Sequence, residues 1–492
     1  MSLIHVKNLT FAYEGSYDPI FENVSFQIDT DWKLGFSGRN GRGKTTFLQL
    51  LLGKYEYGGS ISASVGFDYF PFPVENGERS TADLVGEIVP DCELWQLMRE
   101  LSLLKVSDDV LDRPFASLSN GEQTKVLLAA LFLKENRFLL IDEPTNHLDL
   151  DGRAIVSRYL RAKRGFILVS HDRAFLDNCV DHILSINKTN IEIQRGRFSD
   201  WLENKRRQDS YELAENEKLK KDIKRLSEAA RRTSQWSDQV EKTKTGIRNA
   251  DVFVDRGYIG HKAAKMMKRS KSMERRQQAA IEEKSKLLHN IESAEHLKLS
   301  QLAYHKTRLV ELDRVSIRYG GKRVGGDVSF AIEQGERIAL TGANGSGKSS
   351  ILKLVCGEKL EYEGNLRLGS QLAISYVPQD TSDLRGGLTE YARSFGIDES
   401  LFKSILRKLD FARVQFEKDI SSYSGGQKKK VFIARSLCER AHLHVWDEPL
   451  NFVDVISRMQ IEELLLEHSP TLLFVEHDSE FYSRIATKVV RL

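Results

Sequence analysis

Cysteine, proline and long apolar runs are all scarce in this sequence. Its 492 residues include only 4 cysteines and 9 prolines. The cysteines, Cys92, Cys179, Cys356 and Cys438, do not have the spacing of a zinc or redox site, which predicts buried thiols in a reducing cytosol. No apolar run approaches the roughly 18–20 residues of a membrane helix. The first seven residues alternate like a strand rather than forming a signal peptide. We therefore expect a cytoplasmic protein without membrane spans.

The charge is nearly balanced overall but unevenly distributed. The formal net charge is only +3, and the composition, 40% apolar and 29% charged, is typical of a globular chain. Residues 201–300 hold 24 Lys and Arg against 16 Asp and Glu, whereas the remainder holds 49 against 54. The length suits about three domains. Two mildly acidic lobes are thus expected to flank a basic middle.

Two phosphate-binding loops occur in the chain. Residues 38–45 and 342–349 both fit G-x-x-x-x-G-K-[ST], and their lysines, Lys44 and Lys348, are 304 residues apart. Each loop follows an apolar, strand-like run and precedes a helix-like run, which is the context in which this motif indicates a nucleotide site. The glycines let backbone N–H groups surround phosphates, the lysine meets the β- and γ-phosphates, and the hydroxyl of Thr45 or Ser349 suits Mg²⁺.

Three further motifs repeat in the same order, which indicates a duplicated domain. The stretch 119–123 reappears at 424–427, 139–144 at 444–449, and 169–172 at 475–478. At these residues the chain resembles the ATP-binding cassette ATPases, and this resemblance implies an α/β fold with two tandem P-loop ATPase domains, or cassettes. The expected ATP-binding residues are Gly38, Asn40, Gly41, Gly43, Lys44, Thr45, Thr46, Gly342, Asn344, Gly345, Gly347, Lys348, Ser349 and Ser350, and, in the repeated Ser-Gly signature, Ser119, Gly121, Glu122, Ser424, Gly425, Gly426 and Gln427.

The acidic pairs at the ends of two apolar strands suit metal binding and water activation. Asp142 and Asp447 are placed to hold Mg²⁺, and Glu143 and Glu448 to polarise the attacking water. His171 and His477 are expected to sense the γ-phosphate.

Because the resemblance implies that each signature meets the ATP of the opposite cassette, two ATP molecules would join the cassettes within one chain. Site one would combine Lys44, Asp142, Glu143 and His171 with Ser424 and Gly426, and site two would combine Lys348, Asp447, Glu448 and His477 with Ser119 and Gly121. We expect a monomer with an intramolecular pair of cassettes.

The two halves differ where a glutamine is expected to reach Mg²⁺. The second half supplies Gln379, but the matching position is Phe72, which cannot coordinate a metal. Site one is therefore expected to bind Mg²⁺ differently or to turn over more slowly. Tyr13 and Tyr319 precede the two phosphate loops and are candidates to stack on adenine, although ordinary strand aromatics explain them equally well.

A basic helical hairpin is expected between the cassettes. Residues 201–295 contain no proline, and apolar residues recur at helical spacing on both sides of a glycine-containing stretch. We expect one helix near 203–241 and a second near 261–296, each on the order of 55 Å long. The expected domains are therefore 1–200, 201–303 and 304–492.

The expected tip of the hairpin carries the basic excess. Residues 231–276 hold 13 Lys and Arg against 5 Asp and Glu, among them Lys262, Lys265, Lys268 and Arg269. A solvated helix face is the plain alternative, but a cationic tip on a long arm suits insertion among phosphates. Phe253 and Val254 fall in the loop, where they would either pack locally or enter a binding site.

This layout resembles the ABC-F subfamily, and within it the Lsa-type antibiotic-resistance ribosome-protection proteins. The stretches that carry the closer resemblance are 31–43, 259–271 and 446–451. It implies an ATP hydrolase that uses ATP and Mg²⁺ and associates with the 70S ribosome, where the linker enters the E site near 23S rRNA and P-site tRNA. It also implies that the protein dislodges lincosamides, streptogramin A compounds and pleuromutilins.

Three other functions remain open from sequence. A housekeeping ABC-F factor that rescues stalled ribosomes would have the same ATPase without a drug phenotype. The ATPase subunit of a drug-efflux pump would need a membrane partner and would give no reason for a basic hairpin. A DNA-repair ATPase also needs a basic surface, but such proteins often carry zinc-binding cysteines.

Overall fold

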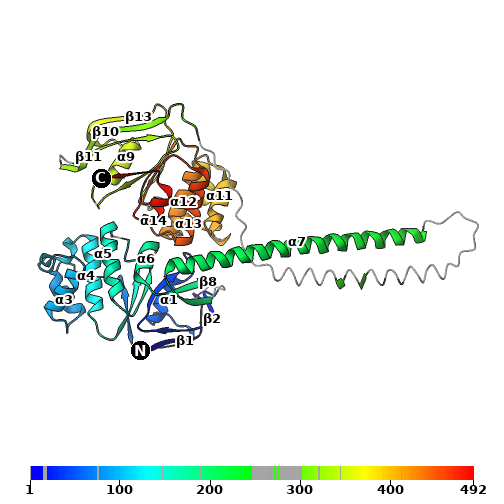
Figure 1. Ribbon diagram of the computed structural model, residues 1–492, viewed down its shortest axis with the longest axis horizontal. Helices are drawn as coiled ribbons and strands as arrows, with labels where there is room; N and C mark the ends of the chain where they lie inside the picture. Colours follow the sequence, from blue (N-terminus) through cyan, green and yellow to red (C-terminus); the bar gives the residue numbers. More distant parts are fainter. Residues whose placement is uncertain are drawn as a thin grey trace, which may run out of the picture. The chain divides into compact units, whose positions relative to one another are not determined.

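A computed structural model describes most of the chain. The described residues are 2–14, 19–74, 77–146, 148–187, 190–245, 302–319, 322–343, 345–411 and 413–492, together with residues 265, 268, 271–272 and 275–276. They group into two compact units, Met1–Trp201 with His296–Leu492, and Leu202–Glu295. The first unit contains both phosphate loops and both signatures, so the contacts that build the sites lie within one unit (Figure 1).

The first cassette contains two sheets. The outer sheet has the order β2-β1-β4 and is antiparallel, and the central sheet has the order β5-β6-β7-β3-β8-β9, in which only the β8–β9 pair is antiparallel. The strands are β1 Leu3–Phe11, β2 Phe21–Asp29, β3 Lys33–Ser37, β4 Gly58–Ser62, β5 Gly66–Phe70, β6 Arg137–Asp142, β7 Phe166–Val169, β8 His182–Asn187 and β9 Asn190–Arg195. The helices are α1 Lys44–Leu51, α2 Thr81–Ile88, α3 Leu94–Leu103, α4 Asn120–Phe132, α5 Leu150–Ala162 and α6 Arg173–Cys179, with short 3₁₀ turns at Asp108–Asp112 and Phe115–Ser117.

The second cassette repeats this plan. Its outer sheet has the order β11-β10-β13, and its central parallel sheet has the order β14-β15-β16-β12-β17. The strands are β10 Arg308–Tyr319, β11 Lys322–Glu333, β12 Arg337–Thr341, β13 Glu361–Leu368, β14 Ile374–Val377, β15 Leu443–Asp447, β16 Leu472–Val475 and β17 Lys488–Arg491. The helices are α9 Lys348–Val355, α10 Leu388–Ser394, α11 Glu399–Lys408, α12 Gly425–Cys438, α13 Val455–His468 and α14 Ser479–Ile485, with 3₁₀ turns at Arg413–Glu417 and Ile420–Ser422. The α/β fold with two tandem ATPase domains is thus confirmed.

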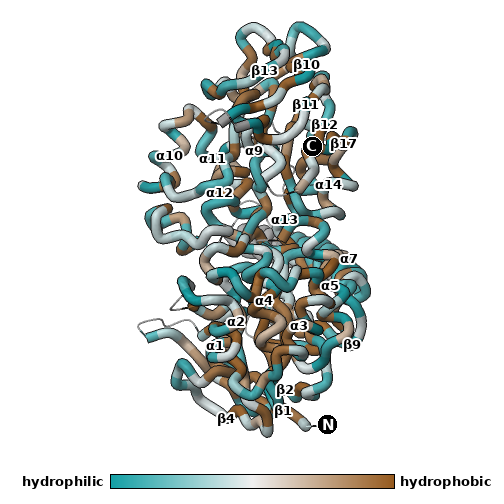
Figure 2. The backbone as a smooth tube through the Cα atoms, turned by 90° about the vertical axis from the view of Figure 1, so that its left-hand side faces the viewer, coloured by the Kyte–Doolittle hydropathy of each residue, from teal (hydrophilic) through white to brown (hydrophobic). Residues whose placement is uncertain are grey.

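The central strands are buried on both faces, as expected for parallel strands covered by helices. Every residue of β7, β15 and β16 is buried. Trp446 in β15 is fully buried and donates its indole N–H to Ser436 Oγ at 2.9 Å. Helix α4 is likewise rich in hydrophobic residues, which are brown in Figure 2. Because each carboxyl end of these strands is fixed by a packed core, the residues that follow them are held in place.

The chain between the cassettes begins with one long helix, α7 Phe198–Thr245, of 48 residues. It starts five residues before the expected position, because Phe198 and Trp201 are buried and pack against each other with ring centroids 5.3 Å apart. Lys265 and Lys268 are helical and exposed. Phe253, Val254, Lys262 and Arg269 lie outside the described residues. Among the described residues, no helix combines the length and apolar character needed to cross a membrane.

The four cysteines are free thiols, but the expectation that all are buried holds only for Cys179. The other three are half-buried: Cys356 and Cys438 pack against the outside of core clusters, and Cys92 lies between α2 and α3.

Candidate functional site

The first phosphate loop is a tight turn between β3 and α1. Gly41 and Gly43 have φ of 79° and 90°, in the left-handed region where side chains are strained. A Cβ atom on Gly43 would also lie 2.4 Å from Ile20 Cγ2. The Lys44 ammonium donates to the carbonyl oxygens of Gly38 at 2.6 Å and Arg39 at 3.2 Å. The lysine charge is therefore held inside the loop that would receive phosphates.

The second phosphate loop has the same geometry. Gly345 and Gly347 have φ of 80° and 92°, and Lys348 Nζ donates to the carbonyl oxygens of Gly342 and Ala343, both at 2.9 Å. Thr46 and Ser350 follow on α1 and α9. Asn344 lies outside the described residues. Burial lowers the pKa of Lys348, and the negative charges of Glu448, Asp149 and Asp447 oppose this shift.

Each loop hydroxyl meets an aspartate at the end of the neighbouring strand. Thr45 Oγ1 donates to Asp142 Oδ2 at 3.0 Å, and Ser349 Oγ donates to Asp447 Oδ1 at 3.1 Å. Adjacent hydroxyl and carboxylate oxygens are donors that Mg²⁺ prefers, and Mg²⁺ normally completes its shell with water and substrate phosphates. Both pairs therefore fit a magnesium ion. Burial raises the pKa of Asp447 to about 6, and burial also raises that of Asp142.

The glutamate after each aspartate is paired with a histidine. Glu143 Oε1 lies 3.3 Å from His171 Nε2, and Glu448 Oε1 lies 3.3 Å from His477 Nε2. Both glutamates have positive φ, 52° and 46°. Such strained backbone in a non-glycine residue is concentrated at functional sites. In each cassette, the structure thus brings together the glutamate and the histidine for which the sequence predicted catalytic roles.

The two glutamates differ in what else they contact. Glu448 Oε2 accepts from the amides of Gln379 at 2.9 Å and Asn451 at 2.6 Å. Burial opposes ionisation of Glu448, but the hydrogen bonds and charge of His477 and those two amides hold its pKa below the ordinary value. Burial and the neighbouring Asp142 instead raise the pKa of Glu143 to about 8. Phe72 occupies the position of Gln379 and is half-buried after β5, so it offers no such amide.

Both signature serines cap helices. Ser119 Oγ accepts from Glu122 N and Ser424 Oγ accepts from Gln427 N, both at 3.3 Å. The helices α4 and α12 therefore begin at the residue after each serine, because the capping boxes complete the first turn. Free N–H groups at such helix starts favour an anion.

The second signature lies against the first phosphate loop. Asn40 Nδ2 donates to the Phe452 carbonyl oxygen at 2.6 Å, and a Cβ atom on Gly426 would lie 2.7 Å from Asn40 Nδ2. Gly425 lies beside the Phe452 ring. At the other site, the negative charge of Asp149 in the first cassette opposes the lowering of the Lys348 pKa by burial. Residues of opposite cassettes therefore meet at the first phosphate loop, and a charge of the first cassette acts on the second loop.

Two arginines at these boundaries were missed in the sequence. Arg153 Nη1 donates to Asp172 Oδ2 at 2.9 Å and, across the cassettes, to the His477 carbonyl oxygen at 3.1 Å. Its counterpart Arg458 donates to Asp478 Oδ2 at 3.0 Å. Extending the internal repeat to these arginines would have identified them, because both fall at the same offset as the acidic pairs.

The adenine-stacking candidates are only partly described. Tyr13 is 42% exposed, packs edge-on against Phe11, and has its hydroxyl 2.8 Å from Thr46 Oγ1. An exposed ring anchored beside the first phosphate loop suits a stacking role. The side chain of Tyr319 lies outside the described residues.

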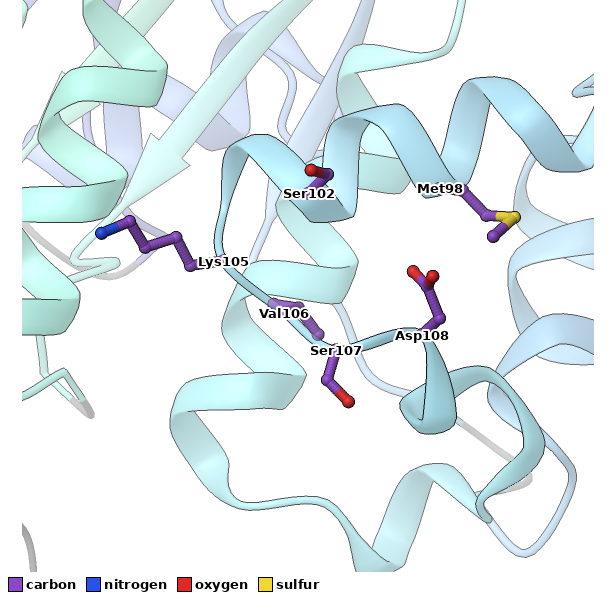
Figure 3. Close-up of a pocket in the computed structure, with 6 residues that line it drawn as sticks. All are labelled: Met98, Ser102, Lys105, Val106, Ser107 and Asp108. Carbon is purple, nitrogen blue, oxygen red and sulfur yellow. The ribbon is translucent and has the colours of Figure 1, made fainter.

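One open hollow of about 550 Å³ lies away from these groups. It is lined by Met98, Ser102, Lys105, Val106, Ser107 and Asp108, from the end of α3 and the segment after it (Figure 3). It contains no phosphate-loop or signature residue, so it is not part of either nucleotide site.

Comparison with known proteins gives matches over nearly the whole of this chain. The family model described as ABC transporter matches residues 21–146 and 326–451, just over half of the chain. Putative ATP-binding protein YdiF of Bacillus subtilis is 27% identical over 100% of this chain and 80% of its own length. Ribosome protection protein VmlR of the same organism is 27% identical over 96% and 84%. ABC transporter F family member 2 of Arabidopsis thaliana is 26% identical over 99% and 76%.

The solved structures agree in fold. The archaeal ribosome recycling factor aABCE1, in complex with stalk protein aP1, has a TM-score of 0.63 and 19% identity, covering 98% of this chain and 87% of that one. At this identity the likeness concerns the fold alone. Two matches to one family model, each spanning a phosphate loop and an Asp-Glu pair, show that the chain belongs to the ABC transporter family, as an ATP-hydrolysing protein with two ABC domains.

Proposed function

We propose that this protein is a ribosome-bound ABC-F ATPase that enters the ribosomal E site and dislodges antibiotics from the peptidyl-transferase centre. It thereby confers resistance to lincosamides, streptogramin A compounds and pleuromutilins. The observation that carries the proposal is the long charged segment inserted between two ATPase domains. Helix α7 alone has 48 residues, which corresponds to about 72 Å. A helix of this length is about four times the mean helix of a globular protein.

The charge of this segment favours a nucleic-acid partner. Residues 201–300 carry a net charge of +8, and the described Lys265 and Lys268 are exposed. Lysine and arginine that neutralise phosphates dominate binding to RNA and make it salt-dependent. The similarity to a protein named for ribosome protection supports the same partner. Association with 23S rRNA and P-site tRNA is therefore part of the proposal.

The proposed catalytic cycle uses the two sites as a switch. The phosphate loops and the opposite signatures bind two ATP molecules, and Mg²⁺ held at Thr45–Asp142 and Ser349–Asp447 would neutralise phosphate charge. Glu143 and Glu448 accept a proton from the attacking water, at the Oε1 atom beside each histidine. ATP binding holds the cassettes together on the ribosome, and hydrolysis releases them.

Ribosome cosedimentation with drug susceptibility tests the proposal. A sensitive bacterial host expressing the chain is expected to gain resistance, and the Glu143→Gln/Glu448→Gln double variant to pellet more strongly with ribosomes in ATP. The matched control is the parent chain in ADP. Ribosome binding without a drug phenotype would instead support a housekeeping translation factor. Recovery in the membrane fraction without ribosomes would support the ATPase of an efflux pump and refute the proposal.

A further inference from the structure

Two buried charged residues accompany site two and have uncharged counterparts in the first cassette. Lys429 on α12 and Glu476 after β16 are 1% and 4% exposed. The internal repeat aligns them with Thr124 and Ser170, which are also buried but neutral. A buried charge is costly unless it is paired and hydrogen-bonded. The contacts of these two residues therefore need an explanation.

Lys429 joins the ends of two neighbouring strands. Its ammonium donates to the carbonyl oxygen of Pro378, just after β14, at 2.9 Å, and to that of Asp447, the last residue of β15, at 3.5 Å. Pro378 directly precedes Gln379, and Asp447 directly precedes Glu448. Lys429 thus fixes the main chain beside two residues of the site without contacting their side chains.

Glu476 joins the next strand end to the loop that follows Glu448. Its Oε1 atom accepts from Leu450 N at 2.7 Å, and its Oε2 atom accepts from His477 N at 3.1 Å. Leu450 directly precedes Asn451. In the first cassette the corresponding loop is held by two hydroxyl groups, with Thr145 Oγ1 3.2 Å from Ser170 Oγ. Leucine at 450 removes that hydroxyl, and the longer Glu476 reaches the backbone instead.

These contacts converge on one carboxylate. Glu448 is contacted by the side chains of Gln379, Asn451 and His477. Lys429 holds the backbone of Pro378, which precedes Gln379, and Glu476 holds that of Leu450, which precedes Asn451. Glu476 also holds His477 through the backbone N–H of that residue. Burial lowers the pKa of Lys429 to about 8, and the charge of Glu476 opposes that shift more than any other carboxylate does.

We propose that the buried charged residues Lys429 and Glu476 position Gln379, Asn451 and His477 around Glu448 for ATP hydrolysis at site two. Neither residue is a catalytic group. Lys429 holds the backbone at the ends of β14 and β15, and Glu476 takes the place of the Thr145–Ser170 hydroxyl contact of the first cassette. This inference rests on site two being an ATP-hydrolysing centre.

The test isolates the two sites. In a Glu143→Gln background only site two turns over, and in a Glu448→Gln background only site one does. Lys429→Thr and Glu476→Ser, which install the residues of the first cassette, are made in both backgrounds, singly and together. Lys428→Thr is the matched control, since Lys428 precedes Lys429 on α12 and is half-buried.

With site two isolated, either single variant is expected to lower kcat about tenfold with KM for ATP unchanged, because the phosphate loop keeps its contacts. The kcat of the double variant is expected to be no lower than that of the less active single variant, because the effects of residues that act as a unit are not additive. With site one isolated, the same variants are expected to stay within about twofold of their parent. The control is expected to retain kcat in both backgrounds.

Two results would overturn the inference while leaving site two as an ATPase centre. One is an unchanged kcat in both single variants with site two isolated. The other is an equal loss of kcat at both sites that matches the loss of folded protein measured by thermal unfolding. That result would show that the two residues have a purely structural role. If the Glu143→Gln parent itself had no ATPase activity, the assignment of site two would fail, and the inference with it.

Discussion

Glu143 and Glu448, the two proposed general bases, are expected to make the ATP sites respond differently to pH. Burial and Asp142 raise the pKa of Glu143 to about 8, whereas hydrogen bonds and charge from His477, Asn451 and Gln379 outweigh burial and keep that of Glu448 below its ordinary value. A general base must be ionised to accept a proton. The hydrolysis rate of site one should therefore increase as pH rises through about 8, and that of site two should already be maximal near neutrality.

The size of the effect follows from the fraction of Glu143 that is ionised. For a pKa of about 8, this fraction is about one-tenth at pH 7 and about nine-tenths at pH 9. The Glu448→Gln variant, in which only site one works, should thus gain about ninefold in kcat between those values. The Glu143→Gln variant should change by less than about twofold. The difference between the two variants is the decisive quantity.

The assay is initial ATPase rate at saturating ATP and Mg²⁺ from pH 6 to 9.5 in overlapping buffers. The double glutamine variant supplies the background rate, and ATP binding measured at each pH separates changes in KM from changes in kcat. Identical profiles for the two single variants, or a steeper rise for Glu143→Gln, would refute the reasoning. It would mean that the amides around Glu448 do not set its proton affinity.

Three further outcomes are expected. Changing Lys265 and Lys268 together to Gln should weaken ribosome binding and reduce its log–log salt slope by about 1.5, since each phosphate contact contributes about 0.7–0.9; an unchanged slope in a salt titration would mean a solvated face. Gly426→Ala places a Cβ atom 2.2 Å from the Phe452 carbonyl oxygen, so ATPase activity should fall at least about tenfold while thermal stability of the cassettes changes little, and wild-type activity would argue against the contact. Phe253→Ala should reduce drug resistance without loss of ATPase activity or ribosome pelleting, and full resistance would show that this ring is dispensable.

The arrangement of the candidate nucleotide-binding residues was predictable because their signal is local. A glycine-rich loop between an apolar strand and a helix fixes the place of Lys44 and Lys348, and an acidic pair at a strand end fixes Asp142 and Asp447. These motifs are contiguous, so they need no knowledge of packing. Their repetition in the same order also predicted that each glutamate shares a site with a histidine, but not that the two side chains are paired.

Long-range burial was not predictable in the same way. Lys429 lies in a run of three lysines, which in sequence is typical of a solvated face, yet α12 buries Lys429 and Lys430 and leaves Lys428 half-buried. Lys430 pairs with Asp454 at 2.9 Å. Only the packed helix distinguishes these three lysines. The early start of α7 has a similar origin, because it depends on the burial of Phe198 and Trp201 rather than on helical periodicity.

The way α7 begins bears on how force could pass through the chain. Ser199 N, in its first turn, donates to Asp177 Oδ1 on α6 at 2.7 Å, and α6 starts at the residue after Asp172, next to His171. The strand before α7, β9, pairs with β8, which is the neighbour of the phosphate-loop strand β3. The first turn of this helix is therefore connected on one side to the helix that follows His171 and on the other to the sheet that carries the first phosphate loop. A displacement of the helix would act on both of these parts of the first cassette.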